Sequence, residues 1–232
     1  ILESLGDKQL AGFRQAMGVH RVGGAGDGPR PDAASPTMID RESEAAELEQ
    51  LWAAVRGGKR RELLLEGEAG VGKSRLVEHL ANVVSATGGR VVAIHCSEAL
   101  QHSAFYPAAA ALRRLLVGTA QGRLNEDALR EALTKTGVPE DLVSRALVPL
   151  SSLLDGGRSV NVLPQQLRAA VFELVIELLD RLAGGTALLL VVEDVHRADA
   201  STAQLLDLIR QRSIAPILIL ATQRSGASGQ TD

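Results

Sequence analysis

The sequence predicts an α/β fold, a mostly parallel sheet with helices on both of its faces. Three observations lead to this prediction. A glycine-rich stretch at residues 67–74 follows a short apolar run and precedes an amphipathic stretch, so strand, loop and helix come in that order. The continuous apolar runs 187–192 and 217–221 have the composition of strands that helices cover on both faces. Stretches of helical periodicity separate the runs, as parallel strands require.

Composition limits the class of protein. A chain of 232 residues can hold one sizeable α/β domain plus extra segments. Its hydrophobic content is 45% and its aromatic content 2%, so the core must consist of Leu, Val, Ile and Ala. The net charge of -3 does not favour nucleic acid as the main ligand. A single cysteine, Cys96, excludes an internal disulfide, and neither a signal peptide nor a membrane-length apolar run is recognisable. These features predict a cytoplasmic protein with no membrane partner.

The glycine-rich stretch fits the phosphate-binding pattern G-x-x-x-x-G-K-S/T at every fixed position. Its glycines let successive backbone N–H groups point at phosphates, and the following helix adds the partial positive charge of its N-terminus. Lys73 can reach the β- and γ-phosphates as a catalytic group, and the Ser74 hydroxyl can ligate magnesium. The alternative is a glycine-rich turn with a surface lysine. The candidate nucleotide-binding residues are Gly67, Glu68, Ala69, Gly70, Val71, Gly72, Lys73, Ser74 and Arg75.

The other elements are predicted from periodicity and from turn residues. Asp40 is expected to cap a helix that ends at Gly57-Gly58 and places Trp52 in the core. Pro149 is expected to break the helical pattern of 124–150, with a loop following from Ser151 to Pro164. The further predicted strands are 62–66, 90–96, 187–192 and 217–221, and the further predicted helices are 75–84, 108–117, 167–182 and one that follows Asp199, with Ser201 and Gln204 at capping-box spacing.

Two adjacent carboxylates, Glu193 and Asp194, follow the apolar run 187–192. Hydrolysis of a bound nucleotide needs a magnesium ligand and a group that orients water, and both come from the carboxyl end of a buried strand. We assign Glu193 to an indirect contact with the magnesium ion and Asp194 to water activation, although the sequence leaves the reverse order open. The alternative is an exposed acidic turn after a core strand.

Polar residues beyond these carboxylates are weaker candidates. Arg224, and Thr222 through its hydroxyl, can sense the γ-phosphate at the end of the run 217–221, and a solvated arginine is the alternative. His196 can contact the phosphates or cap a loop. Asp199 is expected to start a helix rather than to bind metal. The cluster His95, Cys96, Glu98 and His102 lacks zinc-ligand spacing.

Together these residues resemble the ATPase domain of the AAA-like/STAND group, which occurs in LuxR-type regulators and in class III adenylate cyclases with an attached ATPase. The phosphate loop matches the group's pattern in full. Arg41-Glu42 resembles its glycine-arginine-glutamate start, with Asp40 in place of the glycine, so Arg41 becomes a candidate contact on the adenine side. The stretch 193–199 resembles its acidic motif, with Arg197 in place of a tryptophan.

The resemblance implies a P-loop NTPase three-layer sandwich whose strands, numbered within this domain, run in the order 2-3-4-1. ATP and Mg²⁺ are the expected cofactors, and the lid is expected to lie beyond residue 232. The implied function is a regulatory ATPase that switches a multidomain signalling or transcription-regulatory protein. The alternatives are a nucleotide-binding scaffold without useful turnover and an origin-recognition-like, DNA-associated ATPase. The expected partners are ATP or ADP and other domains of one longer chain, and homo-oligomerisation is left open.

The first 22 residues form two short strand-like pieces around Gly12 and Gly18. They resemble the closing segment of a class III nucleotidyl cyclase domain through Leu5, Gly6, Leu10, Gly12, Phe13, Val19, Arg21 and Val22. The stretch 23–37 is rich in Gly, Pro and Ala and predicts a linker. The predicted domains are therefore a cyclase tail (1–22), a linker (23–37), the ATPase domain (38–226) and a frayed tail (227–232).

Overall fold

The chain divides into two compact units, Ile1–Asp40 and Arg41–Asp232. The computed structural model describes residues 2–8, 17–22, 41–98, 105–117, 126–154 and 165–226. In the first unit, β1 (Leu2–Lys8) and β2 (Met17–Val22) form an antiparallel pair. The predicted linker, the predicted C-terminal tail and Gly12 lie outside the described residues, and the likeness of the first unit to a cyclase stays a prediction.

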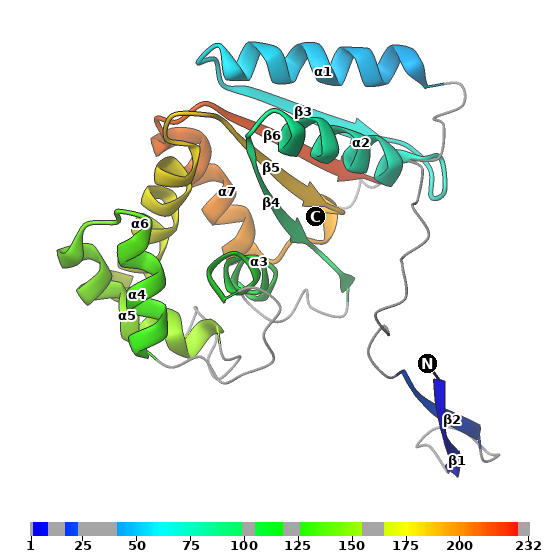
Figure 1. Cartoon of the computed structure of the whole chain (residues 1–232), viewed down its shortest axis with the longest axis horizontal. Coiled ribbons are helices and arrows are strands. Elements are labelled where there is room, and N and C mark those ends of the chain that lie inside the picture. The colour runs from blue at the N-terminus through cyan, green and yellow to red at the C-terminus, as the bar shows by residue number, and fades with distance from the viewer. Residues whose placement is uncertain are drawn as a thin grey trace. The chain divides into compact units, whose positions relative to one another are not determined.

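The second unit contains a parallel sheet of four strands (Figure 1). The strands are β3 (Arg61–Glu66), β4 (Arg90–His95), β5 (Leu188–Glu193) and β6 (Ile217–Gln223). Their order is β3-β6-β5-β4, which confirms the order that the family resemblance implied. Because all four strands run in one direction, their carboxyl ends meet at one edge, where His95 lies opposite Glu193 and Glu66 opposite Gln223.

Helices cover both faces of this sheet, so the unit has three layers (Figure 1). On one face lie α1 (Glu42–Arg56) and α2 (Lys73–Ala86). The other face is covered by α3 (Tyr106–Val117), α6 (Gln165–Ala183) and α7 (Ala200–Arg212). Helices α4 (Glu126–Lys135) and α5 (Glu140–Leu154) pack on other helices rather than on the sheet. The predicted α/β sandwich is confirmed.

Successive side chains of a strand point to opposite faces of the sheet, so each residue's position in the strand decides which helices its side chain contacts. In β5, Leu188, Leu190 and Val192 belong to the large apolar cluster that contains α3, α6 and α7. Leu189 and Val191 are equally buried but lie outside that cluster, on the face that α1 and α2 cover. The strand is therefore apolar at every position from 188 to 192 because both of its faces are covered.

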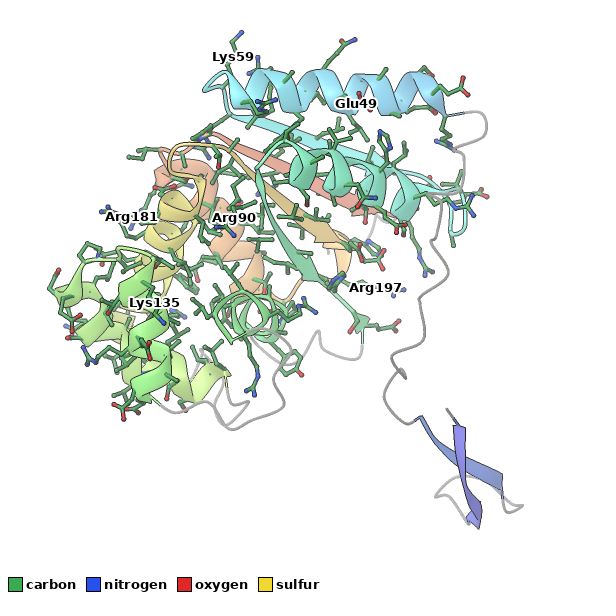
Figure 2. The ribbon with its side chains drawn as sticks, viewed as in Figure 1. Glu49, Lys59, Arg90, Lys135, Arg181 and Arg197 are labelled. Atoms are coloured by element: carbon green, nitrogen blue, oxygen red, sulfur yellow. The ribbon has the colours of Figure 1, made fainter. Side chains whose placement is uncertain are left out.

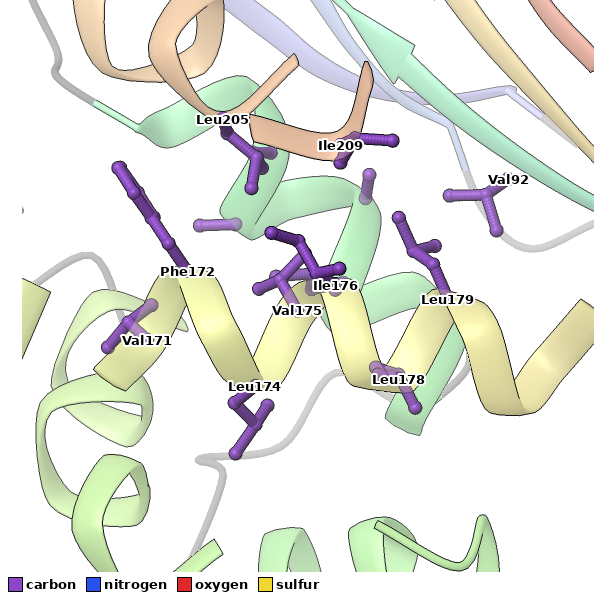
Figure 3. Packing of buried hydrophobic residues seen from close by; sticks show 14 of the residues in the cluster. Val92, Val171, Phe172, Leu174, Val175, Ile176, Leu178, Leu179, Leu205 and Ile209 are labelled. Carbon is purple, nitrogen blue, oxygen red and sulfur yellow. The ribbon is translucent and has the colours of Figure 1, made fainter. Parts of the chain in front are cut away.

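Helix α6 lies between the sheet and the helices α4 and α5. Leu179 points toward Val92 of the sheet and Phe172 toward α7, whereas Leu174 and Leu178 point toward α4 and α5 (Figure 3). A helix buried on both sides needs apolar residues around most of its circumference, which explains its strong apolar pattern. Leu167 is 38% exposed, because it lies in the first turn, before the buried segment that starts at Ala170.

Pro149 lies inside α5 instead of ending it, so the predicted break is wrong, as is the predicted loop for residues 151–154. Proline cannot donate a hydrogen bond to the carbonyl one turn earlier, which weakens a helix. The helix nevertheless continues because Leu150, Leu153 and Leu154, which follow the proline, are buried. The rest of the predicted loop, residues 155–164, lies outside the described residues.

Two predicted helix starts also differ from the structure. Arg41 occupies the N-cap position of α1 and makes no side-chain cap bond, while Asp40 lies outside the described residues. Asp199 caps α7, so the predicted capping box of Ser201 and Gln204 is wrong. The prediction of Asp199 as a helix-start residue is confirmed.

Candidate functional site

The loop from Gly67 to Ser74 connects the end of β3 to the start of α2. Gly70 and Gly72 have φ angles of 81° and 100°, a left-handed region in which residues with a Cβ atom are strained. At Gly67, a Cβ atom would lie 2.9 Å from the Val71 Cγ1 atom. The loop's path therefore requires its glycines, for conformation at two positions and for space at the third.

This loop presents free hydrogen-bond donors. Within the described part of the chain, the N–H groups of Gly70 and Gly72 have no hydrogen-bond partner. The first N–H groups of α2 also lack intrahelical acceptors, and no acidic residue lies in its first turn. The Lys73 Nζ donates to the carbonyl oxygens of Gly67 (2.6 Å) and Glu68 (2.9 Å). The loop thus combines unpaired donors with one ammonium group, a donor set that suits phosphate oxygens.

The two carboxylates sit where β5 ends. Glu193 is the last residue of the strand, and Asp194 has φ 52° and ψ 49°, a left-handed conformation that is uncommon for a residue with a side chain. A hydrogen bond across the sheet supports this turn, because the Asp194 N–H donates to the Thr222 Oγ1 of β6 at 3.1 Å. The short helix η3 (Val195–Arg197) then leads the chain away from the strand. The side chains of Glu193 and Asp194 are both partly exposed.

Alternation places His95, Glu193 and Thr222 on the face of the sheet that α2 covers. In β4, β5 and β6, the residues that precede each of them, Ile94, Val192 and Ala221, belong to the apolar cluster on the opposite face. The three side chains thus lie at or next to the carboxyl ends of neighbouring strands, beside the phosphate loop that follows β3. A bond from the Ser225 N–H to the Gly67 carbonyl (3.3 Å) joins the end of β6 to the start of that loop.

His95 is a residue of this site that the sequence analysis did not assign to it. Its Nδ1 atom lies 2.7 Å from the Glu193 Oε2 atom. No sequence spacing indicates this contact, because the two residues are 98 positions apart. The contact becomes recognisable only when β4 is known to pair with β5. The last residues of the two strands, His95 and Glu193, are then direct neighbours.

Asp199 has a structural role. Its buried carboxylate accepts hydrogen bonds from the N–H groups of Ser201, Thr202 and Phe105, and from the Thr202 hydroxyl. The bond from Phe105 supports another left-handed residue, with a φ of 68°, whose ring packs on Phe172 at a centroid distance of 5.5 Å. With its oxygens engaged in this way, Asp199 holds the start of α7 and the residue before α3.

Cys96 follows His95 and is buried. Burial, and then the negative charges of Asp199 and Asp194, raise the pKa of its thiol to about 11. The thiol is therefore protonated near neutral pH and is a poor metal ligand. Among the described residues, no group of three or more His, Cys, Asp and Glu side chains is arranged to hold a metal ion. Magnesium beside a nucleotide needs fewer protein ligands, because phosphates and waters supply the others.

The arginine candidates differ in their surroundings. Arg224 is exposed directly after β6, between Thr222 and the Ser225 that contacts the phosphate loop. Arg41 instead pairs with Glu44 at 3.2 Å within α1, so the described contacts do not connect its guanidinium to the loop. Arg197, in η3 beyond the carboxyl end of β5, lies at the opposite end of the sheet from Arg90, the first residue of β4 (Figure 2).

His196 lies one residue before Arg197, in η3. Its Nδ1 atom is buried and has no hydrogen-bond partner within the described part of the chain.

A parallel α/β sandwich whose glycine loop joins a strand to a helix, with acidic residues ending a nearby strand, defines the P-loop class of nucleotide-binding domains. The family model described as "AAA ATPase domain" matches residues 37–220, most of the chain. The chain therefore belongs to the AAA ATPase domain family and is an ATP-binding ATPase domain.

One relative of this chain is a much longer protein. An uncharacterized protein of Rhizobium meliloti (strain 1021) is 26% identical over 235 residues, which cover 94% of this chain and 22% of that protein. The chain thus spans about a fifth of the length of the relative it matches. Among the described residues, no helix is both long and apolar enough to cross a membrane.

Proposed function

We propose that the chain binds Mg²⁺-ATP, hydrolyses it slowly, and thereby switches a longer signalling or transcription-regulatory protein. One observation carries this proposal. The phosphate loop, with its unpaired N–H groups and Lys73, lies at the same sheet edge as Glu193 and Asp194. That arrangement brings donors for phosphate and carboxylates for metal and water to one place. The chain covers only about a fifth of the relative's length, which supports a role as one domain among several.

Each residue has a role that follows from its chemistry. The loop N–H groups and Lys73 bind the β- and γ-phosphates, and the exposed Arg75 lies in the first turn of α2. Ser74 and Glu193 are the oxygen donors for magnesium, which would neutralise phosphate charge when bound. Asp194, fixed by Thr222, orients and deprotonates the attacking water.

Two arginines complete the assignment. Arg224 senses the γ-phosphate from the end of β6, a role that its place beside the loop supports. Arg41 reaches the adenine side only if its pair with Glu44 opens.

A nucleotide-binding scaffold without turnover is the second candidate. It is favoured because charged groups of the site already have partners within the protein. Lys73 is already bound to two loop carbonyls, and Glu193 is already paired with His95. In such a protein, nucleotide would hold domains together without being consumed.

Magnesium-dependent ATP binding and phosphate release, measured on the unmutated chain, Lys73→Ala and Asp194→Asn, test both candidates. Loss of binding in Lys73→Ala supports the phosphate-loop assignment. Phosphate release that disappears in Asp194→Asn, while ATP stays bound, supports the switch. Binding with no release by the unmutated chain supports the scaffold. Equal binding by the unmutated chain and Lys73→Ala would contradict both.

A further inference from the structure

The last residues of β4 and β5 are joined through their side chains. His95 and Glu193 are register partners, and the Nδ1 and Oε2 atoms of the pair are 2.7 Å apart. Both side chains are on the α2 face, and about half of His95 and a third of Glu193 remain exposed, at 49% and 33%. The contact is thus partly open to solvent, on the face of the sheet that α2 covers.

The chemistry of the two groups decides the direction of this hydrogen bond. An ionised carboxylate accepts hydrogen bonds but has no proton to donate, so the Nδ1 atom of His95 must carry the proton. Only one oxygen of Glu193 is used. Within the described part of the chain, its Oε1 atom has no hydrogen-bond partner.

A glutamate side chain that is not tethered samples many rotamers, and fixing it in one of them costs conformational entropy. A neighbour that donates to one oxygen removes part of that freedom before a ligand arrives. On the other side of β5, the Thr222 hydroxyl accepts a hydrogen bond from the backbone N–H of Asp194. The Glu193 side chain and the Asp194 backbone are therefore each held from a different neighbouring strand.

We propose that His95 is a positioning residue, which holds Glu193 through Oε2 and leaves Oε1 free for the magnesium of a bound nucleotide. This inference rests on the proposed function, because it assumes that Glu193 serves the metal. Groups that orient a metal-binding carboxylate typically change metal affinity roughly 10-fold to 100-fold when they are removed. His95→Ala should therefore weaken the coupling between magnesium and nucleotide without removing the phosphate contacts.

The chain contains a matched control for this variant. His79 of α2 contacts Glu49 of α1 over the same 2.7 Å, and it is also partly exposed, but the pair joins two helices away from the carboxyl edge of the sheet. His79→Ala removes a histidine–glutamate contact of equal length. Any effect that is particular to His95 must then come from its position beside Glu193.

The first experiment measures binding of a fluorescent ATP analogue while Mg²⁺ is varied, with a magnesium-free series under EDTA. His95→Ala should raise the Mg²⁺ concentration for half-maximal binding roughly 10-fold, with magnesium-free binding unchanged. His95→Asn, whose amide can place an N–H near the position of Nδ1, should restore most of the loss, and His79→Ala should resemble the unmutated chain. Equal Mg²⁺ midpoints for His95→Ala and the unmutated chain would overturn the proposal. So would an equal defect in His95→Asn and His95→Ala.

The second experiment needs no nucleotide. The imidazole nitrogen chemical shifts of His95 should show the proton on Nδ1 in the unmutated chain, and this preference should be lost in Glu193→Ala, which leaves no side-chain acceptor. A proton on Nδ1 in both proteins would show that Glu193 does not hold the ring and would overturn the proposal. Failure of the proposed function would give a different result in the first experiment. The unmutated chain itself then binds no nucleotide, and the positioning role falls with it.

Discussion

The hydroxyl of Thr222 accepts a hydrogen bond from the backbone N–H of Asp194 at 3.1 Å, which ties the end of β6 to the turn after β5. Thr222 is buried, while Asp194 stands in a left-handed conformation that is uncommon for aspartate. A single hydroxyl thus helps to hold the residue proposed to activate water. This relationship leads to the first prediction.

Thr222→Val keeps the shape of the side chain but removes the acceptor, so the Asp194 N–H loses its partner. We expect the free energy of unfolding to fall by about 1–2 kcal/mol. ATP binding should persist, while phosphate release should slow on the order of tenfold, equivalent to about 1.4 kcal/mol. Single-turnover phosphate release and urea denaturation measure the two effects. Thr222→Ser, which keeps the hydroxyl, is the control, and equal release rates in the Val and Ser variants would contradict the prediction.

Gly72→Ala tests whether the loop's conformation, rather than the space around it, binds phosphate. A Cβ atom at Gly72 would meet nothing within 4 Å, so the expected cost is conformational, about 1–2 kcal/mol at a φ of 100°. Because relief of this strain would move the N–H groups of the loop, ATP affinity should fall at least tenfold. Isothermal titration calorimetry gives the affinity.

Gly58→Ala is the matched control for that substitution. Gly58 has a φ of 89° and equally open surroundings, but it lies in the turn between α1 and β3. Both variants should lose similar stability, and only Gly72→Ala should lose affinity. An equal loss of affinity in the two would show that general destabilisation is responsible.

Asp199→Ala removes the acceptor of four hydrogen bonds in a buried position. We expect a loss of about 3 kcal/mol in the free energy of unfolding, from the lost helix cap and from the unpaired Phe105 N–H. Asp199→Asn keeps one acceptor oxygen and should lose less. Chemical denaturation gives the stabilities. If Asp199 were a metal ligand instead, Asp199→Asn would leave stability intact but change the magnesium dependence of ATP binding.

The thiol of Cys96 should be unreactive in the folded protein. Its pKa of about 11 leaves, near neutral pH, a thiolate fraction on the order of 100-fold below that of an exposed cysteine. Because the folded pKa is raised, the thiol contributes stability at pH values below the unfolded pKa, and this contribution is lost as pH rises toward 11. Alkylation followed by mass spectrometry measures the reactivity, and the chain's single cysteine makes the result unambiguous. Rapid labelling under native conditions would contradict the burial.

Local signals in the sequence predicted much of the fold. The apolar runs at 187–192 and 217–221 form strands, as predicted. They are apolar at successive positions because helices cover both faces of the sheet. The glycines of the phosphate loop are required by backbone angles that the chain adopts between β3 and α2. The order of the strands, in contrast, came from the family resemblance, since no local pattern specifies which strands become neighbours.

Predictions from local sequence rules failed where tertiary contacts outweighed the preferences of the nearest residues. Pro149 should end a helix by its own chemistry, yet α5 continues because the leucines after it are buried. Asp199 caps α7 through the N–H groups of Ser201 and Thr202, as its place in the sequence indicates, but it also accepts from the N–H of Phe105, which is 94 residues away. The continued α5 helix and the Phe105 contact are not encoded in the nearest residues.

The phosphate loop, the strands and the two carboxylates can be recognised in the sequence, because each depends on residues that are adjacent in the chain. The contacts of His95 with Glu193 and of Thr222 with Asp194 depend instead on how the strands are arranged in the fold. These contacts require β4, β5 and β6 to lie side by side in one register. That register follows from the burial of whole strand faces, a property of the complete sheet and its helices.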